Sequence, residues 1–198
     1  MEISIHHLTD ANLSFANTVR EIAGWNQTLT DWRRFLSLEP EGCFLAEWDG
    51  QPAGTATTTC YGDSDLAWIG MVLVHPDFRR RGIGTALLKH CISYLTDTRS
   101  IQSVKLDATP EGRPLYRKLG FRDEWPLCRW MGKDLRQSRE PVSRRKQKLA
   151  EHHYELDRMV FGSNRRRLLE SLAEESTVVV ANENGFGMAR EGSRATYL

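Results

Sequence analysis

The sequence lacks several features that would assign a protein to a broad class at once. It has no run of about 18 apolar residues and no charged, apolar and small-residue leader, so we expect neither a membrane span nor a secretion signal, and a cytoplasmic location. Its net charge is only +1 over 198 residues, which argues against general nucleic-acid binding. With 40% hydrophobic and 27% charged residues, the composition is that of an ordinary globular protein.

Cysteine is also scarce, and the thiols do not have the paired spacing of a metal site. Each lies in an apolar run, where cysteine behaves as a small hydrophobic residue. We therefore expect free structural thiols and no metal centre. The cysteines are Cys43, Cys60, Cys91 and Cys128.

Two familiar phosphate-binding loops are missing as well. No segment matches the Gly-x-x-x-x-Gly-Lys-Ser/Thr pattern of a P-loop. A dinucleotide-binding turn would need Gly-x-Gly-x-x-Gly, and Leu87 stands where the third glycine should follow Gly82 and Gly84. The residues themselves therefore exclude both loops.

The chain has instead one stretch, Trp68 to Leu95, around which the rest is organised. Residues Trp68 to Val74 are apolar or small and predict a central strand, which His75-Pro76 ends because proline cannot extend a ladder. After Gly82, apolar residues recur every four positions, which predicts an amphipathic helix of roughly four turns. These apolar residues are Ile83, Leu87, Cys91 and Leu95.

The turn between this strand and helix has the composition of an anion site. It reads Arg79, Arg80, Arg81, Gly82, Ile83, Gly84 and Thr85. The first amides of a helix lack internal partners, glycines let the backbone approach a phosphate, and arginines add charge-assisted hydrogen bonds. Taken alone, the turn could be an exposed basic cluster, but strand, turn and helix together favour a phosphate site.

Two motifs in this half of the chain resemble those of a known family. The segment Val72-Leu73-Val74-His75-Pro76, followed by Arg79-x-x-Gly82-x-Gly84, is similar to the acyl-CoA-binding motif of the GNAT superfamily of N-acyltransferases. Downstream, Leu115-Tyr116-Arg117-Lys118-Leu119-Gly120-Phe121 is similar to the family's Leu-Tyr-x-x-x-Gly-Phe. The resemblance covers about residues 1 to 131.

The resemblance implies an α/β fold with a central mixed sheet flanked by helices, and acetyl-CoA as cosubstrate. It implies that the pyrophosphate lies on the Arg80 to Thr85 turn and the pantetheine arm beside Val72, Leu73 and Val74. Tyr116 is implied as the general acid for the departing thiolate. The general base stays open, because Val104 stands where the family has a carboxylate; Asp107, Asp65 or a relayed water are the alternatives.

Other segments alternate between strand and helix patterns on both sides of the central stretch, as an α/β sheet requires. In the family, the first helix pair forms part of the acceptor pocket, which implies that Trp25 and Trp32, together with Phe35, contact substrate; the alternative is that they pack the core. We expect strands over residues 2–7, 43–48, 52–60 and 103–108, and helices within 10–24, 28–36 and 111–119. Asp10 is the expected cap of the first helix, Thr28 and Asp31 fit a capping box for the second, and Asp49-Gly50 predicts a hairpin turn.

The last third of the chain changes character. Residues 133–148 carry seven Lys or Arg against two acids, which predicts a basic linker after a first domain of residues 1–132. Residues 149–198 predict two helices and a hairpin turning at Asn184-Gly185, and resemble the opening half of a second GNAT unit. Such a half-unit needs a partner for its apolar face: the first domain, a second subunit in a homodimer, or residues missing from a truncated chain.

The resemblance implies that the chain is an acetyl-CoA-dependent N-acetyltransferase. A primary amine of a small molecule or peptide would attack the thioester directly in a ternary complex. The alternative is a CoA-binding regulatory or interaction module without chemistry.

Overall fold

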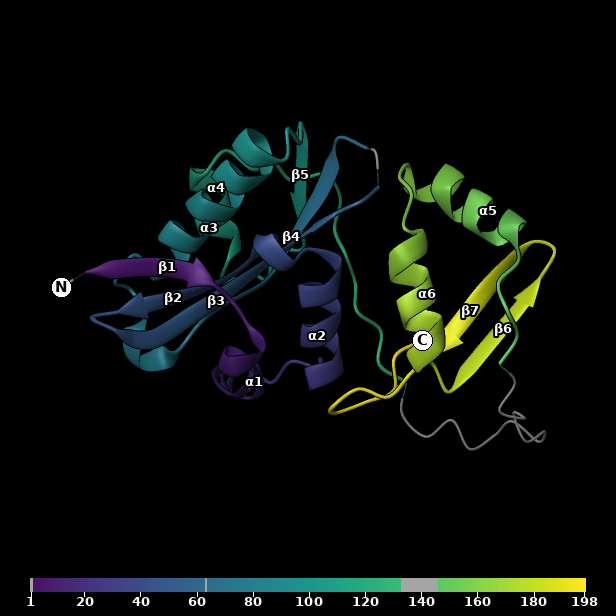
Figure 1. The fold of residues 1–198 in the computed structure, drawn as a ribbon, viewed down its shortest axis with the longest axis horizontal. Helices are drawn as coiled ribbons and strands as arrows, with labels where there is room; N and C mark the ends of the chain where they lie inside the picture. Colours follow the sequence, from purple (N-terminus) through teal and green to yellow (C-terminus); the bar gives the residue numbers. More distant parts are fainter. Residues whose placement is uncertain (1, 63, 133–145) are drawn as a thin grey trace.

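The computed structural model describes residues 2–62, 64–132 and 146–198 (Figure 1). Neighbouring strands of the main sheet pair antiparallel except β4 and β5, which are parallel. This is the mixed sheet that the sequence predicts. In the described residues it has five strands, in the order of the chain: β1 (Ile3–His7), β2 (Cys43–Trp48), β3 (Gln51–Cys60), β4 (Leu66–Val74) and β5 (Ser103–Leu106).

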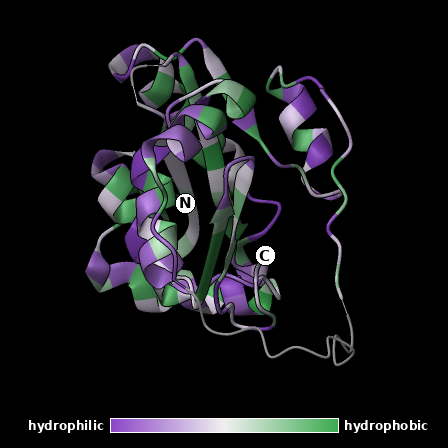
Figure 2. Cartoon of the chain, turned by 90° about the vertical axis from the view of Figure 1, so that its right-hand side faces the viewer, coloured by the Kyte–Doolittle hydropathy of each residue, from purple (hydrophilic) through white to green (hydrophobic). Residues whose placement is uncertain are grey.

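Helices cover both faces of this sheet (Figure 1). On one face, α3 (Ile83–Ser93) and the short α4 (Arg113–Lys118) pack on a cluster that includes Phe44 and Ile69. On the other, α1 (Leu13–Ile22) and α2 (Leu29–Leu38) pack on a cluster that includes Leu45 and Met71. Hydrophobic residues concentrate on the strands between these helices, as Figure 2 shows. The core thus has two halves, one on each side of the sheet.

The structure confirms two of the helix caps and turns that the sequence predicts, and contradicts a third. Thr28 and Asp31 form the predicted capping box of α2, with Thr28 N–H donating to Asp31 Oδ2 at 2.7 Å. Asp49 and Gly50 have the positive φ angles of the predicted β2–β3 turn. Asp10 does not cap a helix: it begins a 3-10 turn that Thr9 precedes, and α1 starts only after that turn.

The central strand β4 contains an irregularity that the sequence does not reveal. Met71 has φ +50°, and the pairing with β3 shifts register between Thr55 and Thr57. Thr55 Oγ1 donates a hydrogen bond of 3.0 Å to the Met71 carbonyl, which ties down the bulge. A bulge changes the strand's direction and twist, so the two halves of β4 point differently.

Pairing between β4 and β5 ends where this irregularity begins. Leu66 pairs with Ser103, and the ladder runs only as far as Ile69 and Leu106. Residues 70–74 of β4 therefore have a strand neighbour on the β3 side and none on the β5 side within the described residues. The sheet opens at this point.

The segment after α4 does not close that opening as a strand. Residues 121–132 are extended, without regular secondary structure, and hold several exposed apolar side chains. Trp125 is 62% exposed and Trp130 is 92% exposed. Cys128 is exposed too, so the expectation that all the thiols are structural is wrong for this one; it rests on the apolar neighbours, which are themselves at the surface.

The C-terminal part forms the predicted helices and hairpin. They are α5 (Glu151–Phe161), α6 (Arg166–Glu175), β6 (Val178–Asn182) and β7 (Gly185–Ala189). Of the predicted basic linker, residues 133–145 lie outside the described residues. Its last residues are not a free connector, because Lys146 pairs with Val179 of β6 and Gln147 N–H donates to the Val179 carbonyl.

This C-terminal part packs on the first part of the chain, beside α2 (Figure 1). A network of charges joins them: Arg34 of α2 pairs with Asp31 at 2.5 Å and with Glu175 of α6, and Arg190 pairs with Asp31 at 3.0 Å. Asp31 is 2% exposed and Arg34 is 6% exposed. In this structure, the C-terminal part therefore packs on α2 of the preceding part of the chain.

We predict that Asp31→Ala lowers the free energy of unfolding by about 3 kcal/mol, because two arginines would lose the buried carboxylate that neutralises them. Urea unfolding followed by tryptophan fluorescence measures this. The control is Glu151→Ala, which removes an exposed partner of Arg166 and should change little. A loss below about 1 kcal/mol for Asp31→Ala would contradict the role given to the network.

A second prediction concerns the start of α3. Gly82 precedes the helix with φ +85°, where an alanine is strained, so Gly82→Ala should cost about 1 kcal/mol of stability. At Gly84 a Cβ would meet Leu115 and Val74 only at 3.5 and 3.7 Å, so Gly84→Ala should leave stability unchanged or slightly higher. Thermal unfolding of both variants checks the pair, and equal losses would refute the distinction.

Candidate functional site

The turn between β4 and α3 presents unpaired backbone amides. A 3-10 turn at Pro76–Phe78 ends the strand, and α3 begins after Gly82. The first helical hydrogen bond of α3 runs from Ala86 N–H to the Gly82 carbonyl at 2.9 Å. The amides of Ile83, Gly84 and Thr85 therefore have no partner inside the helix, and they lie at its positive end. Such a corner is chemically suited to an anion.

The three arginines of this turn are held differently. Arg79 Nε donates a hydrogen bond of 3.2 Å to the Val74 carbonyl, which braces the turn against the end of β4. The guanidinium of Arg81 lies 5.1 Å from the ring centre of Trp48 and 5.6 Å from that of Phe78. Arg80 has φ +60° and makes no side-chain hydrogen bond or ion pair with any residue that the structure describes. Arg80 is thus available to a ligand, whereas the other two shape the turn.

Three elements meet at Gly84. A Cβ built there would lie 3.5 Å from Leu115 Cδ2 of α4 and 3.7 Å from Val74 Cγ2 of β4. The start of α3, the end of β4 and the face of α4 therefore converge on one glycine. Both motifs that the sequence singles out are brought together here, although about 30 residues separate them in the chain.

Tyr116 lies on α4 and its ring packs into the core cluster under α3. The ring centre is 6.2 Å from that of Phe121, and a Cβ on Gly112 would come within 2.8 Å of the ring. Burial raises the pKa of the Tyr116 phenol above its ordinary value. The hydroxyl makes no hydrogen bond to a described residue, so its proton is free to be donated to a ligand.

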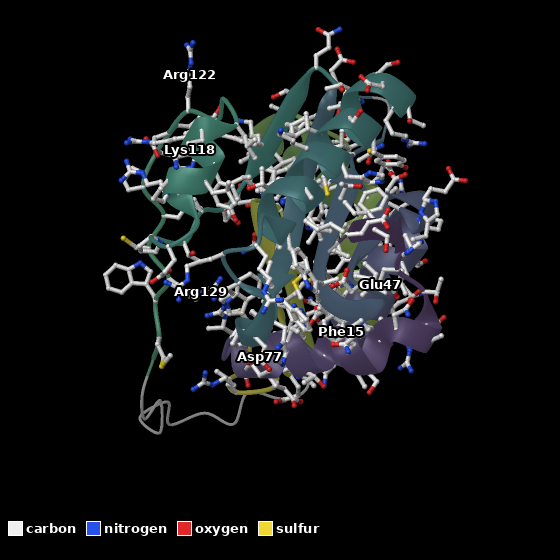
Figure 3. The ribbon with its side chains drawn as sticks, turned by 90° about the vertical axis from the view of Figure 1, so that its left-hand side faces the viewer. Phe15, Glu47, Asp77, Lys118, Arg122 and Arg129 are labelled. Atoms are coloured by element: carbon white, nitrogen blue, oxygen red, sulfur yellow. The ribbon has the colours of Figure 1, made fainter. Side chains whose placement is uncertain are left out.

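Carboxylates near the opening of the sheet differ in their positions. Asp107 directly follows β5, at the end where β4 and β5 separate, and burial raises the pKa of its carboxyl although Arg129 opposes the shift. Arg129 lies on the side of the extended segment nearer the sheet, whereas Arg122 points away from the molecule (Figure 3). Asp65 precedes β4, roughly 17 Å of strand away from Gly70. Asp63 lies outside the described residues.

The loop between α1 and α2 packs on the other face of the sheet. Trp25 of this loop is half-buried and packs on the cluster that contains Met71 and Leu73 of β4. Trp32 is 0% exposed inside the same cluster, so its side chain offers no surface to a ligand in this structure. The packing alternative describes Trp32, whereas Trp25 keeps part of its side chain at the surface.

Aromatic contacts from the C-terminal part reach the same side of the sheet. The Phe161 ring lies 5.1 Å from that of Tyr61 and 6.3 Å from that of Trp68, the first residue of the predicted central strand. Sequence reasoning did not find these contacts, because nothing in a linear pattern relates residues about 95 positions apart. The one sequence feature that hints at such a contact is the aromatic Tyr61 in an otherwise polar loop.

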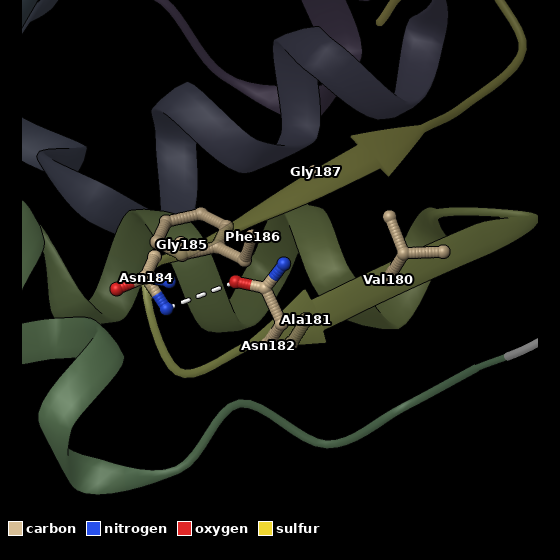
Figure 4. Close-up of a pocket in the computed structure, with 7 residues that line it drawn as sticks. All are labelled: Val180, Ala181, Asn182, Asn184, Gly185, Phe186 and Gly187. Atoms are coloured by element: carbon tan, nitrogen blue, oxygen red, sulfur yellow. Dashed lines mark hydrogen bonds between the residues drawn. The ribbon is translucent and has the colours of Figure 1, made fainter.

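A surface hollow lies away from this opening. It measures about 400 Å³ on the β6–β7 hairpin and is lined by Val180, Phe186 and their neighbours (Figure 4). No titratable side chain lines it. Within the described part of the chain there is also no group of His, Cys, Asp and Glu that could hold a metal ion, and no helix is long and apolar enough to cross a membrane.

Curated relatives match the first part of the chain. A holothin acyltransferase from Pseudoalteromonas sp. is 32% identical over 112 residues, which are 54% of this chain and 35% of the relative. An uncharacterized N-acetyltransferase from Methanocaldococcus jannaschii is 30% identical over 115 residues, which are 54% of this chain and 50% of the relative. The chain therefore spans half or less of the length of these relatives.

A solved structure matches nearly the whole chain. It is that of a proposed acetyltransferase from Pyrococcus horikoshii, with a TM-score of 0.77 and 25% identity over 95% of this chain and 68% of the other. The model of the acetyltransferase (GNAT) family matches residues 8–121, a range that holds the glycine corner, the opening between β4 and β5, and Tyr116. The chain belongs to the acetyltransferase (GNAT) family.

Proposed function

We propose that this protein is an acetyl-CoA-dependent N-acetyltransferase that transfers the acetyl group directly to a primary amine in a ternary complex. One observation carries the proposal: the sheet opens between β4 and β5 beside a corner of unpaired amides. Membership of the acetyltransferase (GNAT) family supports acyl-CoA chemistry, and the N-acetyltransferase from Methanocaldococcus jannaschii supports nitrogen as the acceptor atom.

The cosubstrate would lie along the second half of β4. Its pyrophosphate would accept hydrogen bonds from the amides between Arg80 and Thr85 and from the Arg80 guanidinium. The helix dipole alone is worth about 0.3–1 kcal/mol, whereas each arginine bond to an anion adds roughly 1.5–3 kcal/mol. Val72, Leu73 and Val74 would pair with the amides of the pantetheine arm, as an added strand does. The free β5-side edge of residues 70–74 supports this role.

The acceptor would enter from the side of Trp25. A primary alkylamine has a pKa of about 10.4, so only about one molecule in a thousand is neutral and nucleophilic at pH 7. Asp107 is the better base of the two open candidates, because it lies at the end of β5 where the sheet opens and its pKa is raised by burial. A bound water that passes the proton of the amine to Asp107 is the alternative route.

In the transfer step, the amine nitrogen attacks the thioester carbonyl carbon. The C–N bond forms, the C–S bond breaks, the amine loses one proton to the base, and the coenzyme A thiolate gains one. We propose Tyr116 as the donor of that second proton. Complete transfer is uphill by roughly 2 kcal/mol for an ordinary phenol and thiol, and burial of Tyr116 increases the gap, so the phenol acts mainly as a hydrogen-bond donor.

We also propose that residues 149–198 are the first half of a second unit of this kind, after a domain of residues 1–132 and a linker of residues 133–148. The order α5, α6, β6, β7 repeats α1, α2, β2, β3. The match to the Pyrococcus horikoshii structure extends over 95% of the chain, so it includes this part.

We propose that the acceptor is a small polar molecule or a peptide with a primary amino group. One relative, the holothin acyltransferase, is named for a small acceptor of its own.

Arg80→Ala should weaken coenzyme A binding about tenfold, because one charge-assisted hydrogen bond to phosphate is lost. Isothermal titration calorimetry measures it. Arg122→Ala is the matched control: it removes an arginine that points into solvent and should leave the affinity unchanged. If both variants weaken binding equally, general positive charge and not the corner attracts the cosubstrate.

Tyr116→Phe should lower kcat about tenfold or more while the KM for acetyl-CoA stays the same, because the thiolate loses its proton donor but the packing of the ring is kept. Thiol release from acetyl-CoA with spermidine, an aminoglycoside and a short peptide as acceptors provides the assay. Unchanged kcat would remove Tyr116 from the mechanism. Coenzyme A binding by the wild-type chain without turnover on any acceptor would favour a non-catalytic binding module.

A further inference from the structure

The last residues of the chain hold the loop between α1 and α2. Asn26 lies at the centre of this contact: its Oδ1 accepts hydrogen bonds from the amides of Arg194 and Ala195 at 2.8 and 2.9 Å, and its Nδ2 donates to the Ala195 carbonyl at 2.8 Å. The Asn26 carbonyl accepts a fourth bond, from Ser193 N–H, at 2.9 Å. One side chain and its own backbone thus join the loop to the tail.

Other bonds on both sides of Asn26 reinforce this contact. Ser193 Oγ donates to the Trp25 carbonyl at 3.1 Å and accepts from Arg20 Nη1 at 3.0 Å. Arg194 Nη1 donates to the Gly24 carbonyl at 2.7 Å. The backbone of the loop is therefore bound at three consecutive residues, Gly24, Trp25 and Asn26. A segment with so many bonds to a packed neighbour has little freedom to open.

The tail itself is anchored to the buried charge network. Arg190 and Tyr197 pair through their backbones, and the Arg190 guanidinium lies 4.1 Å from the Tyr197 ring centre while it pairs with Asp31 at 3.0 Å. Residues 190–197 thus form a closed loop fixed at its base on α2. We call residues 190–197 the clamp.

The clamp acts on the side of the sheet where the acceptor would enter. Trp25 packs on the cluster that contains Met71, the bulge residue of β4. One polar atom in the region of the clamp, Gln27 Oε1, is buried and has no hydrogen-bond partner among the described residues. A buried acceptor without a partner indicates a place for water or for a polar group of a bound molecule.

We propose that the clamp positions the acceptor, with Asn26 as the positioning residue: by fixing residues 24–27 it sets the place of Trp25 beside the opening and favours polar amines. This inference rests on the proposed acetyl transfer. It makes the C-terminal part a component of the acceptor site of the first domain. Among the described residues, the clamp makes no hydrogen bond or ion pair with the glycine corner, so it should govern the amine and not the cosubstrate.

Asn26→Ala tests the proposal from the loop side and Ser193→Ala from the tail side. In hydrogen–deuterium exchange of the full chain, amides of residues 23–28 should exchange about fivefold faster or more in both variants. The KM for the best amine of spermidine, an aminoglycoside and a short peptide should rise about tenfold for Asn26→Ala, with the KM for acetyl-CoA unchanged. Ser193→Ala should show a smaller rise in the same direction.

The matched control is Arg167→Ala. Arg167 Nη2 donates to the Ser37 carbonyl at 3.2 Å, so this variant removes a bond between the same two parts of the chain at the far end of α2. It should leave both the loop exchange and the amine KM unchanged. Unaltered exchange in Asn26→Ala and Ser193→Ala, or an equal effect of Arg167→Ala, would overturn the clamp. Absence of transfer by the wild-type chain would instead count against the proposed function, and the exchange data would still decide whether the clamp holds the loop.

Discussion

Backbone pairing between β4 and β5 stops at Ile69 and Leu106, and the layout of the candidate site depends on that stop. A parallel pair that continued would use the amides and carbonyls of residues 70–74 internally, and no ligand could add to the strand. The bulge at Met71 and the bond from Thr55 to its carbonyl turn the second half of β4 away. The same half leads directly into the glycine corner, so one interruption leaves a free strand edge beside a corner of unpaired amides.

The C-terminal part is held by electrostatics that hydrophobic patterning does not show. Asp31 serves the capping box of α2 and also neutralises Arg34 and Arg190, which come from different parts of the chain. Because these charges are buried, each depends on the others, and removal of one leaves the rest without compensation. The sharing of Asp31 couples the start of an α-helix in the first part to the position of the tail, and through the tail to the loop at Trp25.

Much of the fold could be predicted from local patterns. The strand–turn–helix from Trp68 to Leu95, the capping box at Thr28 and the hairpin at Asn184-Gly185 depend on near neighbours in the chain, and the structure has them. The glycine corner and Tyr116 could be named because their motifs are short, although their roles remain proposals. What could not be predicted depends on distant pairs: the end of the β4–β5 ladder, the aromatic contact of Phe161 with Tyr61, and the bonds of Asn26 to Ala195. Solvent exposure of Cys128 and burial of Trp32 also follow from packing and not from their immediate neighbours.

Gly112 shows how a position without a side chain can determine where a neighbouring group lies. A Cβ there would come within 3.0 Å of the Tyr116 hydroxyl as well as against its ring, so any other residue would have to push the phenol aside. The phenol of Tyr116 can therefore lie where it does because the residue four positions earlier has no side chain. A search for important residues that considers only polar or charged groups would pass over this glycine, and a homologue with a larger residue at this position would hold the hydroxyl of its tyrosine in a different place.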